Sequence, residues 1–442
     1  MRIAVVGSGI AGLGAAYRLS RHFGAESITL FEKDTRLGGH AATVDIDYDG
    51  KPVAVDTGFI VFNTLNYPLL TALFAELGVA THRSNMGFSL SLDGGRFEWS
   101  GQETNVVSSF FAQPLNLIRP RLWRMLRDMR RFSSEAVEDR ESGRLAGLSL
   151  GDYLAAKNYG RELVEDYVLP MGAAIWSMSA RAVLDFPAES FIAFFDNHRL
   201  LHWNRPAWRT VAGGSRAYVS KLVNAAGFHV HSGDGAASVK RLAQGVEVIT
   251  TKGHRGHFDA VVLATHSDQA LALLAHPSAE ERRVLGHVRY SENEVILHRD
   301  ARLMPKRKRA WAAWNVIGAS DEGAGERPVM VSYWMNRLQG IDESRPLFVT
   351  LNPRKAPVPE SVFGRFSYAH PQYDAAALAA QRALPELQGR GGIYFAGAWT
   401  GYGFHEDGLR AGYHAADQLI AAHGLTGAPS VPMLAVGAPP RV

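Results

Sequence analysis

The chain of 442 residues contains no cysteine. Disulfide bonds, thiolate metal sites, cysteine-ligated iron–sulfur clusters and a flavin linked through a cysteine are therefore all excluded. Histidine occurs 17 times, but no HExxH-type spacing is present. We therefore expect no metal site.

Long apolar runs and a strong charge of one sign are also absent. No stretch of roughly 18 residues is apolar and uncharged, so no membrane-spanning helix is expected. The 47 basic and 43 acidic residues give a net charge of +4, which is too small to indicate nucleic acid as a partner. Glycines interrupt the apolar N-terminus, so we expect a cytoplasmic protein without a signal peptide. A hydrophobic content of 46% at this length favours two folded domains.

What the chain does have is a glycine-rich motif close to its start. Residues 2–6 are expected to form a short buried strand, and Gly7-Ser8-Gly9-Ile10-Ala11-Gly12 follows at once and opens a helical pattern. A second strand is expected at 27–31 and ends on Glu32, which Lys33 follows. Strand, glycine-rich turn, helix, strand and terminal acid are the parts of a dinucleotide-binding βαβ unit.

Each residue of this motif has a physical role. Gly7 permits the tight turn, Gly9 lets the backbone approach a pyrophosphate, and Gly12 lets the helix pack closely on the strand. The free N–H groups of the first helical turn, which Ile10 and Ala11 begin, favour the negative charge of that group. Glu32, 20 residues after Gly12, is placed to accept hydrogen bonds from a ribose and argues against a 2′-phosphate.

A second pair of glycines narrows the choice of cofactor. Arg36-Leu37-Gly38-Gly39-His40 follows Glu32-Lys33 closely, and its glycines let another loop approach the pyrophosphate. This extension is more typical of chains that bind FAD than of chains that bind NAD. An ordinary β-turn is the alternative, and the register with Glu32 disfavours it.

The remaining elements expected from the sequence are scattered along the chain. A hairpin around Asp49-Gly50 delivers Asp56-Thr57-Gly58-Phe59, a turn placed to lie against a flavin ring. A parallel strand is expected at 258–266 and a last buried strand at 392–397. Residues 62–205 are expected to be mostly helical, with one hairpin near 88–96, and residues 211–218 to open a helix that runs to 224. Strands and loops are expected at 285–370, a loop and helix within 403–421, and a loose tail at 425–442.

The opening glycine motif, Gly213-Gly214, Ala264-Thr265 and Phe395-Ala396-Gly397 occur in the order seen in the flavin-containing amine oxidase and phytoene desaturase superfamily. The chain resembles, more narrowly, the oxidoreductase-like domain of plant cyclopropane fatty acid synthases and its free-standing bacterial relatives. The segments that carry this resemblance are Leu37–Ala41, Gly58–Asn63, Leu169–Ser177, Asn197–Leu201, Arg205–Trp208 and Gly401–Leu409.

The resemblance implies an α/β protein in which a Rossmann-like FAD-binding domain (residues 1–85, 206–285 and 390–424) is interleaved with an α+β substrate domain (86–205 and 286–389). FAD is then held without a covalent bond. Ala236 is expected to hold the adenine through its backbone. The predicted cofactor-binding residues are Gly7, Gly9, Ile10, Ala11, Gly12, Glu32, Lys33, Gly38, Gly39, His40, Thr57, Gly58, Ala236, Gly397, Asp407, Gly408 and Leu409.

Two departures from the superfamily pattern bear on function. The residue after the last strand's glycine usually binds the ribityl chain, but this chain has Ala398 there, so Glu406 or Asp407 is expected to supply that contact. Amine oxidases place a lysine near the flavin, and the matching stretch, residues 290–295, has none. Amine oxidation is therefore disfavoured.

His405 and Glu406 are the predicted catalytic residues, because they follow a loop expected to abut the flavin. Histidine is the better acid–base candidate of the two, since its ordinary pKa lies near neutrality. The alternative, in which His405 only fixes the loop through hydrogen bonds, stays open.

The stretch from Leu115 to Phe132 mixes six arginines with tryptophan and long apolar side chains. One interpretation is a helix lying on an anionic membrane, which places the protein on the inner face of that membrane. The other is an ordinary amphipathic helix with solvated arginines, and it is slightly favoured. The run Lys306–Arg309 is a further candidate for a basic face.

The sequence thus predicts an FAD-dependent oxidoreductase that dehydrogenates, isomerises or oxidises an apolar substrate such as a fatty acyl chain. Two alternatives stay open. One is amine or carotenoid oxidation on the same fold. The other is a non-catalytic flavin-binding partner of a lipid methyltransferase.

Overall fold

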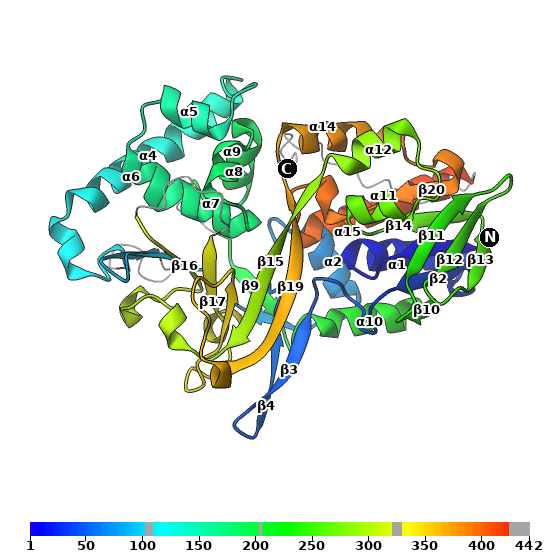
Figure 1. The fold of residues 1–442 in the computed structure, drawn as a ribbon, viewed down its shortest axis with the longest axis horizontal. Coiled ribbons are helices and arrows are strands. Elements are labelled where there is room, and N and C mark those ends of the chain that lie inside the picture. Colours follow the sequence, from blue (N-terminus) through cyan, green and yellow to red (C-terminus); the bar gives the residue numbers. More distant parts are fainter. Residues whose placement is uncertain (102–108, 203–205, 321–328, 424–442) are drawn as a thin grey trace.

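Five short strands that lie far apart in the sequence form one parallel sheet in the computed structural model (Figure 1). The structure describes residues 1–101, 109–202, 206–320 and 329–423; the predicted tail at 425–442 and Arg205 lie outside them. The strands, in their order across the sheet, are β10 (His229–Ser232), β2 (Ile28–Glu32), β1 (Ile3–Val6), β14 (Ala260–Leu263) and β20 (Ile393–Phe395).

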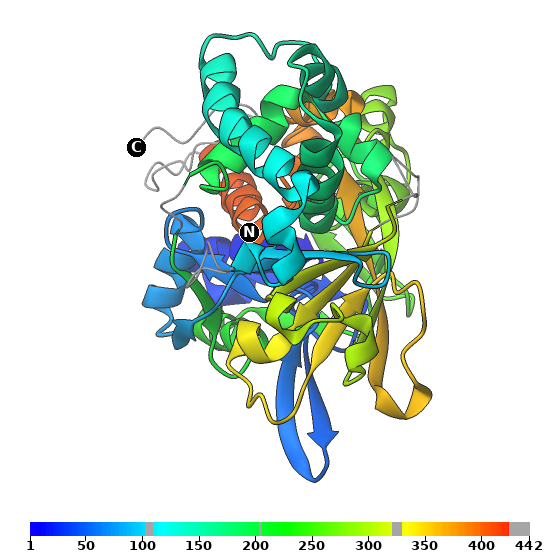
Figure 2. The same ribbon diagram turned by 90° about the vertical axis from the view of Figure 1, so that its left-hand side faces the viewer.

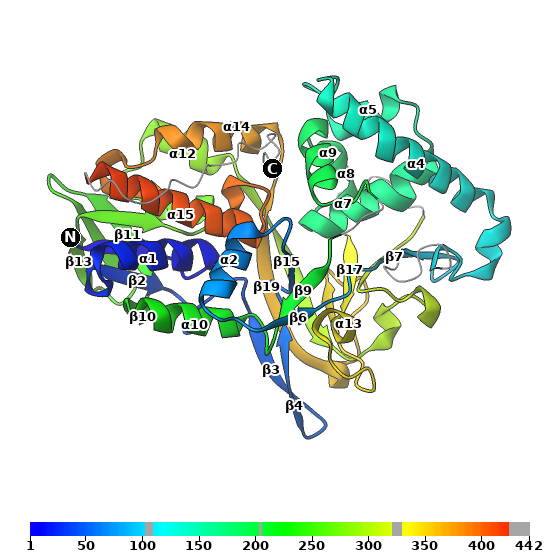
Figure 3. The ribbon, with the colours of Figure 1, turned by 180° about the vertical axis from the view of Figure 1, so that it is seen from behind.

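Both faces of this sheet are covered, which explains why its strands read as continuous apolar runs. Ile3 and Val5 point to a face covered by α1 (Ile10–Phe23), α10 (Arg216–Ala226) and α15 (His405–Ala422), seen from behind in Figure 3. Ala4 and Val6 alternate with them and face the opposite side. That side is covered by an antiparallel sheet of β11 (Ala236–Arg241), β12 (Val246–Thr250) and β13 (Arg255–Phe258).

A second, mixed sheet of seven strands builds the other half of the molecule. Its order is β19 (Val362–Gln372), β15 (Arg289–His298), β18 (Phe348–Leu351), β17 (Met330–Trp334), β16 (Trp314–Gly318), β7 (Phe88–Leu92) and β8 (Phe97–Gly101). Only β16 and β7 pair in parallel in this sheet of the described chain. The long strands β15 and β19 run from this half to the flank of the parallel sheet (Figure 1).

Helices between β8 and β9 pack on the seven-stranded sheet through one large apolar core. They are α4 (Pro120–Glu141), α5 (Leu150–Ala156), α6 (Arg161–Leu163), α7 (Leu169–Trp176), α8 (Ala180–Leu184) and α9 (Ala188–Asn197). The remaining helices are α2 (Pro68–Glu76), α11 (Ser267–Leu273), α12 (Ala279–Gly286), α13 (Met335–Gln339) and α14 (Ala375–Ala383). Among the described residues, no helix is long and apolar enough to cross a membrane.

The predicted hairpin at Asp49-Gly50 is confirmed as β3 (Thr43–Tyr48) and β4 (Lys51–Asp56). Asp49 and Gly50 both have positive φ, as a type I′ hairpin turn requires. The helical prediction for 62–205 missed two short strands, β5 (Val61–Asn63) and β6 (Thr81–Arg83), which pair with β9 (Trp208–Val211). Strands of three residues carry too little periodicity to be read from sequence.

A buried carboxylate fastens the hairpin to both halves of the molecule. Asp56 has no exposed surface and accepts hydrogen bonds from Thr43 Oγ1 (2.6 Å), Ser215 N (2.9 Å), Ser215 Oγ (2.8 Å) and Gln339 Nε2 (3.0 Å). Ser215 precedes α10, so Asp56 satisfies an N–H group at that helix terminus. Gln339 is the last residue of α13 in the other half.

Candidate cofactor-binding site

Two glycines of the loop between β1 and α1, Gly7 and Gly12, leave no room for a side chain. Gly7 has φ +101°, and a Cβ there would lie 2.6 Å from Ala264 O. A Cβ on Gly12 would lie 1.9 Å from Gly7 O, so the helix start packs directly on the turn. These two residues have the roles that the sequence predicts for them.

Gly9 faces open space. It is the N-cap residue of α1, and, apart from its two chain neighbours, no described residue has an atom within 4 Å of the position a Cβ would take. Gly39 approaches from another loop, since a Cβ on it would lie 3.0 Å from Gly9 Cα. Two glycine backbones therefore meet beside the free N–H groups of a helix N-terminus, which fits the pyrophosphate of a dinucleotide.

Ser8 joins three of the predicted pieces, although the sequence pattern assigns it no role. Its N–H and its Oγ–H both donate to Glu32 Oε2, at 2.8 and 2.6 Å. Gly38 N lies 3.1 Å from Ser8 Oγ and from Ser8 O. Ser8 is a variable position of the glycine-rich motif, so its place between Gly7 and Gly9 was the only signal in the sequence that it lies at the site. Its hydrogen bonds hold the Gly7–Gly12 loop, the end of β2 and the second glycine pair together.

The end of β2 is flanked by the segment that leads into β11. Asp234 N donates to Glu32 O (3.2 Å), and Gly233 N donates to Asp34 O (2.9 Å). A Cβ on Gly235 would lie 2.7 Å from the Cβ of Lys33. Ala236 begins β11 next to this crossing. The predicted adenine contact of Ala236 and the predicted ribose contact of Glu32 therefore fall on neighbouring segments.

His40 connects the second glycine pair to the Thr57-Gly58 turn. His40 O accepts from Phe59 N (2.7 Å), and a Cβ on Gly58 would lie 2.3 Å from that oxygen. Thr57 N donates to Ala42 O (2.9 Å), and its hydroxyl lies 2.8 Å from Tyr368 Oη. The turn predicted to lie against the flavin is thus fixed to the predicted phosphate loop on one side and to β19 on the other.

One ring nitrogen of His40, the buried Nε2, has no hydrogen-bond partner among the described residues. Its ring lies 5.2 Å from the ring of Tyr368, 5.6 Å from that of His370 and 6.2 Å from that of His266. Burial lowers the pKa of all three histidines, so they are neutral at pH 7. A neutral, unpartnered imidazole nitrogen is available to a polar atom of a bound cofactor.

The closing loop after β20 lies against the same helix start. A Cβ on Gly397 would lie 2.4 Å from Trp399 Nε1. Asp407 accepts from Tyr402 N (3.1 Å) and Phe404 N (3.0 Å), which closes the turn before α15. A Cβ on Gly408 would lie 2.8 Å from Ile10 Cγ2, and Leu409 is buried in the core shared with Ala11. The predicted residues therefore converge beyond the carboxyl ends of the parallel strands, where ligands bind in such sheets.

His405 is enclosed by protein groups. Its ring stacks on Phe59 with centroids 3.7 Å apart, and its Nε2 lies 3.0 Å from Tyr218 Oη. Burial lowers the pKa of His405 to about 3, so the ring stays neutral across the physiological range. These are the contacts expected of a residue that fixes the loop, and its catalytic role stays a prediction.

Glu406 caps a helix. Its two carboxylate oxygens accept from Leu69 N (2.9 Å) and Leu70 N (3.0 Å) in the first turn of α2, and Arg410 Nη2 lies 3.3 Å away. Burial nevertheless raises the pKa of Glu406 to about 7. A general acid or base works best with a pKa near the working pH. On this criterion the structure favours Glu406 over His405, the reverse of the order expected from ordinary pKa values.

The raised pKa of Glu406 predicts a pH dependence of stability. Because the folded-state pKa of about 7 lies above the ordinary 4.5, the folded protein keeps a proton that the unfolded chain releases. Its contribution is fully present below pH 4.5 and is lost as the pH rises through 7, by on the order of 3 kcal/mol. Denaturant unfolding of the apoprotein at pH 5 and pH 8 measures this difference.

Glu406→Gln is expected to remove most of that dependence, because the amide does not titrate. Glu138 is an exposed acid on α4, and Glu138→Gln serves as the matched control that leaves the dependence unchanged. The same dependence in the Glu406→Gln variant would contradict the assignment.

The parallel sheet, the glycine-rich loop and the converging segments define a Rossmann-like dinucleotide-binding fold. A family model described as an NAD(P)-binding Rossmann-like domain matches residues 5–77. Coproporphyrinogen III oxidase of Mycobacterium tuberculosis is 47% identical over 77 residues, which are 17% of this chain and 16% of that protein. The chain thus matches only 16% of the length of these curated relatives.

Solved structures match almost the whole chain. A triple mutant of putrescine oxidase has a TM-score of 0.69 at 16% identity and covers 95% of this chain and 99% of its own. A fatty acid isomerase from P. acnes that produces CLA has a TM-score of 0.64 at 15% identity and covers 95% and 98%. Cyclohexylamine oxidase from Brevibacterium oxydans has a TM-score of 0.61 at 14% identity and covers 96% and 99%.

The predicted α/β fold class is confirmed by these neighbours, since the chain shares its fold with putrescine oxidase, the fatty acid isomerase and cyclohexylamine oxidase. An oxidoreductase activity and FAD as its cofactor are taken up as proposals below. The narrower likeness to the domain of plant cyclopropane fatty acid synthases, the domain boundaries and the individual site residues stay predictions.

Proposed function

We propose that the protein is an FAD-dependent oxidoreductase that acts on an apolar substrate such as a fatty acyl chain. The residues fit the cofactor: the open space at Gly9, the unpartnered nitrogen of His40 and the buried carboxylate of Glu32 lie on the segments expected to meet FAD. When bound, FAD supplies the redox chemistry by accepting a hydride. The protein's own groups then need only to orient the substrate, exclude water and move a proton.

The proposal of an apolar substrate rests on the aromatic packing around residues 401–404. Phe194 of α9 lies with its ring 5.1 Å from Phe404 and 5.6 Å from Tyr402, and Trp176 of α7 donates to Tyr402 O at 3.2 Å. These helices belong to the predicted substrate half. The loop that leads into the cofactor site is therefore covered by apolar side chains, which suits a hydrocarbon better than a charged amine.

The proton in this proposal is handled by Glu406 or His405. Glu406 has the pKa suited to proton transfer near neutrality, whereas His405 is neutral at every pH at which the protein is expected to work. The rate of flavin reduction is therefore expected to change with pH around pH 7, which gives its pH profile a limb there. That limb should disappear in Glu406→Gln and persist in His405→Gln.

Two measurements test the proposal in sequence. The purified protein should be yellow, or should become so when FAD is added to it. An anaerobic screen of acyl lipids should then bleach the flavin absorbance. A protein that neither contains nor binds FAD would refute the whole proposal, and a protein that binds FAD but is reduced by no lipid would refute the substrate.

Amine oxidation is the second candidate, because two of the similar structures are named as amine oxidases. The sequence lacks a lysine in residues 290–295, now placed in β15, and this absence weighs against it. Reduction of the flavin by amines and not by lipids would select this candidate. Stable association with a lipid methyltransferase without any flavin reduction would instead select the non-catalytic alternative.

A further inference from the structure

Four large apolar side chains lie exposed at one end of α4. Leu115, Leu117 and Ile118 belong to the 3₁₀ turn η2 (Pro114–Ile118), and Trp123 lies in the first turns of α4. The exposed fraction is 76% for Ile118 and 50% for Trp123. The indole N–H of Trp123 donates to Leu117 O (2.9 Å), so the ring lies across the turn. We call these four residues the apolar tip.

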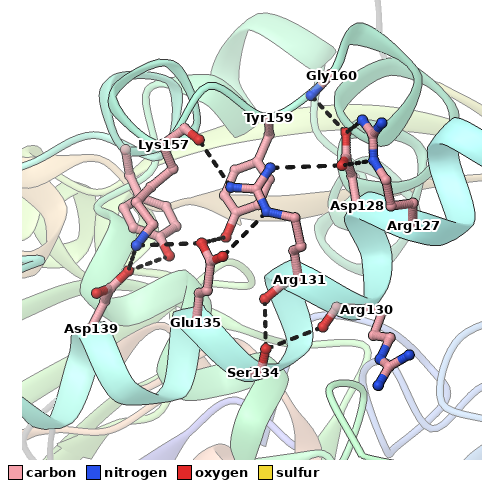
Figure 4. A network of polar contacts seen from close by, with 11 residues as sticks. Arg127, Asp128, Arg130, Arg131, Ser134, Glu135, Asp139, Lys157, Tyr159 and Gly160 are labelled. Atoms are coloured by element: carbon pink, nitrogen blue, oxygen red, sulfur yellow. Dashed lines mark hydrogen bonds and ion pairs between the residues drawn. The ribbon is translucent and has the colours of Figure 1, made fainter.

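The rest of α4 offers no such surface. Leu122, Met125 and Phe132 are buried in the core, and most arginines of the helix bind acids. The pairs are Arg121–Asp166 (2.7 Å), Arg124–Glu162 (3.0 Å), Arg127–Asp128 (2.9 Å) and Arg131–Glu135 (3.2 Å), the last two shown in Figure 4. The body of the helix thus matches the ordinary amphipathic interpretation of residues 115–132. Only its N-terminal end remains as a candidate interaction surface.

Cations without an acidic partner among the described residues lie beside the apolar tip. Arg119 follows η2 directly and donates to Arg96 O (2.7 Å), in the turn between β7 and β8. Arg307 donates to the neighbouring Gly95 O (2.6 Å), which brings the basic run 306–309 to the same turn. We call Arg96, Arg119, Lys306, Lys308 and Arg309 the basic rim.

The rim keeps its charge. Arg307 is neutralised by the buried Glu98 (2.9 Å), but none of the five rim residues forms an ion pair with an acid within the described ranges. Arg96, Lys306, Lys308 and Arg309 are exposed, and Arg119 is half-buried. Figure 2 turns this end of the molecule, with the cyan start of α4, toward the viewer.

We propose that the apolar tip and the basic rim dock the protein on an anionic lipid bilayer. The tip would enter the boundary between headgroups and acyl chains, and the rim would lie on the phosphates. Tryptophan at the edge of such a tip is suited to that boundary, because its ring is apolar and its N–H is polar. Cations around an apolar point match a lipid surface, where negative charge is spread evenly and demands no fixed geometry.

Vesicle co-sedimentation of the full chain tests this. We expect binding to vesicles of phosphatidylcholine with phosphatidylglycerol, weaker binding to phosphatidylcholine alone, and release by high salt. Ile118→Asp should weaken the binding at least about tenfold. Lys308→Gln with Arg309→Gln should weaken it about 25-fold at low salt, or about fivefold for each charge.

Matched controls separate these effects from misfolding. Leu65→Asp alters an apolar side chain that is also about half exposed, between β5 and α2. Arg282→Gln with Arg283→Gln removes two exposed charges from α12, far from the tip (Figure 1). Both controls should bind vesicles as the wild type does. Equal binding by the tip and rim variants, or no vesicle binding by the wild type, would overturn the proposal.

A fluorescent label can locate the contact. Because the chain has no cysteine, Ile118→Cys provides a single thiol for a polarity-sensitive dye. Its emission should shift to the blue on anionic vesicles, whereas a dye on Leu65→Cys should not respond. A dye at position 118 that shifts only on self-association or with a protein partner would overturn the proposal. The inference does not depend on FAD, so protein stripped of flavin should bind vesicles equally well.

Discussion

Gly9→Ala is expected to weaken the binding of FAD by about 100-fold or more while leaving the melting temperature of the apoprotein unchanged. Gly9 has φ −63°, which alanine adopts freely, and nothing in the described chain lies within 4 Å of the new methyl group. The methyl would enter the space proposed for the pyrophosphate and hold it away from the helix N–H groups. A hundredfold loss corresponds to about 2.7 kcal/mol.

Titration of the apoprotein with FAD, followed by flavin fluorescence, measures this affinity. Gly12→Ala is the matched comparison in the same loop, because its methyl would lie 1.9 Å from Gly7 O. That variant should lose stability even without cofactor, whereas Gly9→Ala should not. Unchanged affinity in Gly9→Ala would show that the pyrophosphate lies elsewhere.

The second large effect is expected at Asp56. Asp56→Ala should lower the free energy of unfolding by about 4 kcal/mol, because it leaves the buried donors of Ser215 and Gln339 without an acceptor. Burial raises the pKa of this carboxyl, and the surrounding donors oppose that shift. Asp56→Asn should lower the free energy of unfolding by less, because the amide oxygen still accepts some of these hydrogen bonds. Denaturant unfolding of the apoprotein measures both variants.

Asp45 gives the matched control on the same hairpin. It pairs with Arg216, the residue after Ser215, but both side chains are about half exposed or more. Asp45→Ala should therefore change stability by less than about 1 kcal/mol. Equal losses in the two variants would mean that the hairpin, and not the buried acceptor of Asp56, sets the effect.

The parts of the site that depend on local order were predictable from the sequence. Gly7, Gly9 and Gly12 are separated by fixed spacings along one loop, and Glu32 ends the next strand. Their placement follows from βαβ geometry alone. The return of β14 beside β1 was also readable, because a strand buried on both faces is an unbroken apolar run.

The parts that depend on long-range packing were not predictable. Glu406 caps α2, more than 300 residues earlier in the chain, and no local pattern reveals such a partner. His40 and His370 likewise become neighbours only because β19 packs beside the loop of Gly38 and Gly39. At residues 115–132 the composition is informative, but only the structure separates the paired arginines of α4 from the exposed tip.

The pairing of β15 with β19 bears on how a substrate enters. The two strands are joined in one register from Arg289 opposite Gln372 to Leu297 opposite Gly364, and the register shifts only at His298. They extend across both halves of the molecule (Figure 1). A hinge that swung the halves apart would have to bend or break this ladder. We therefore expect the scaffold to behave as one stiff frame, with access controlled by local movement of loops and short helices.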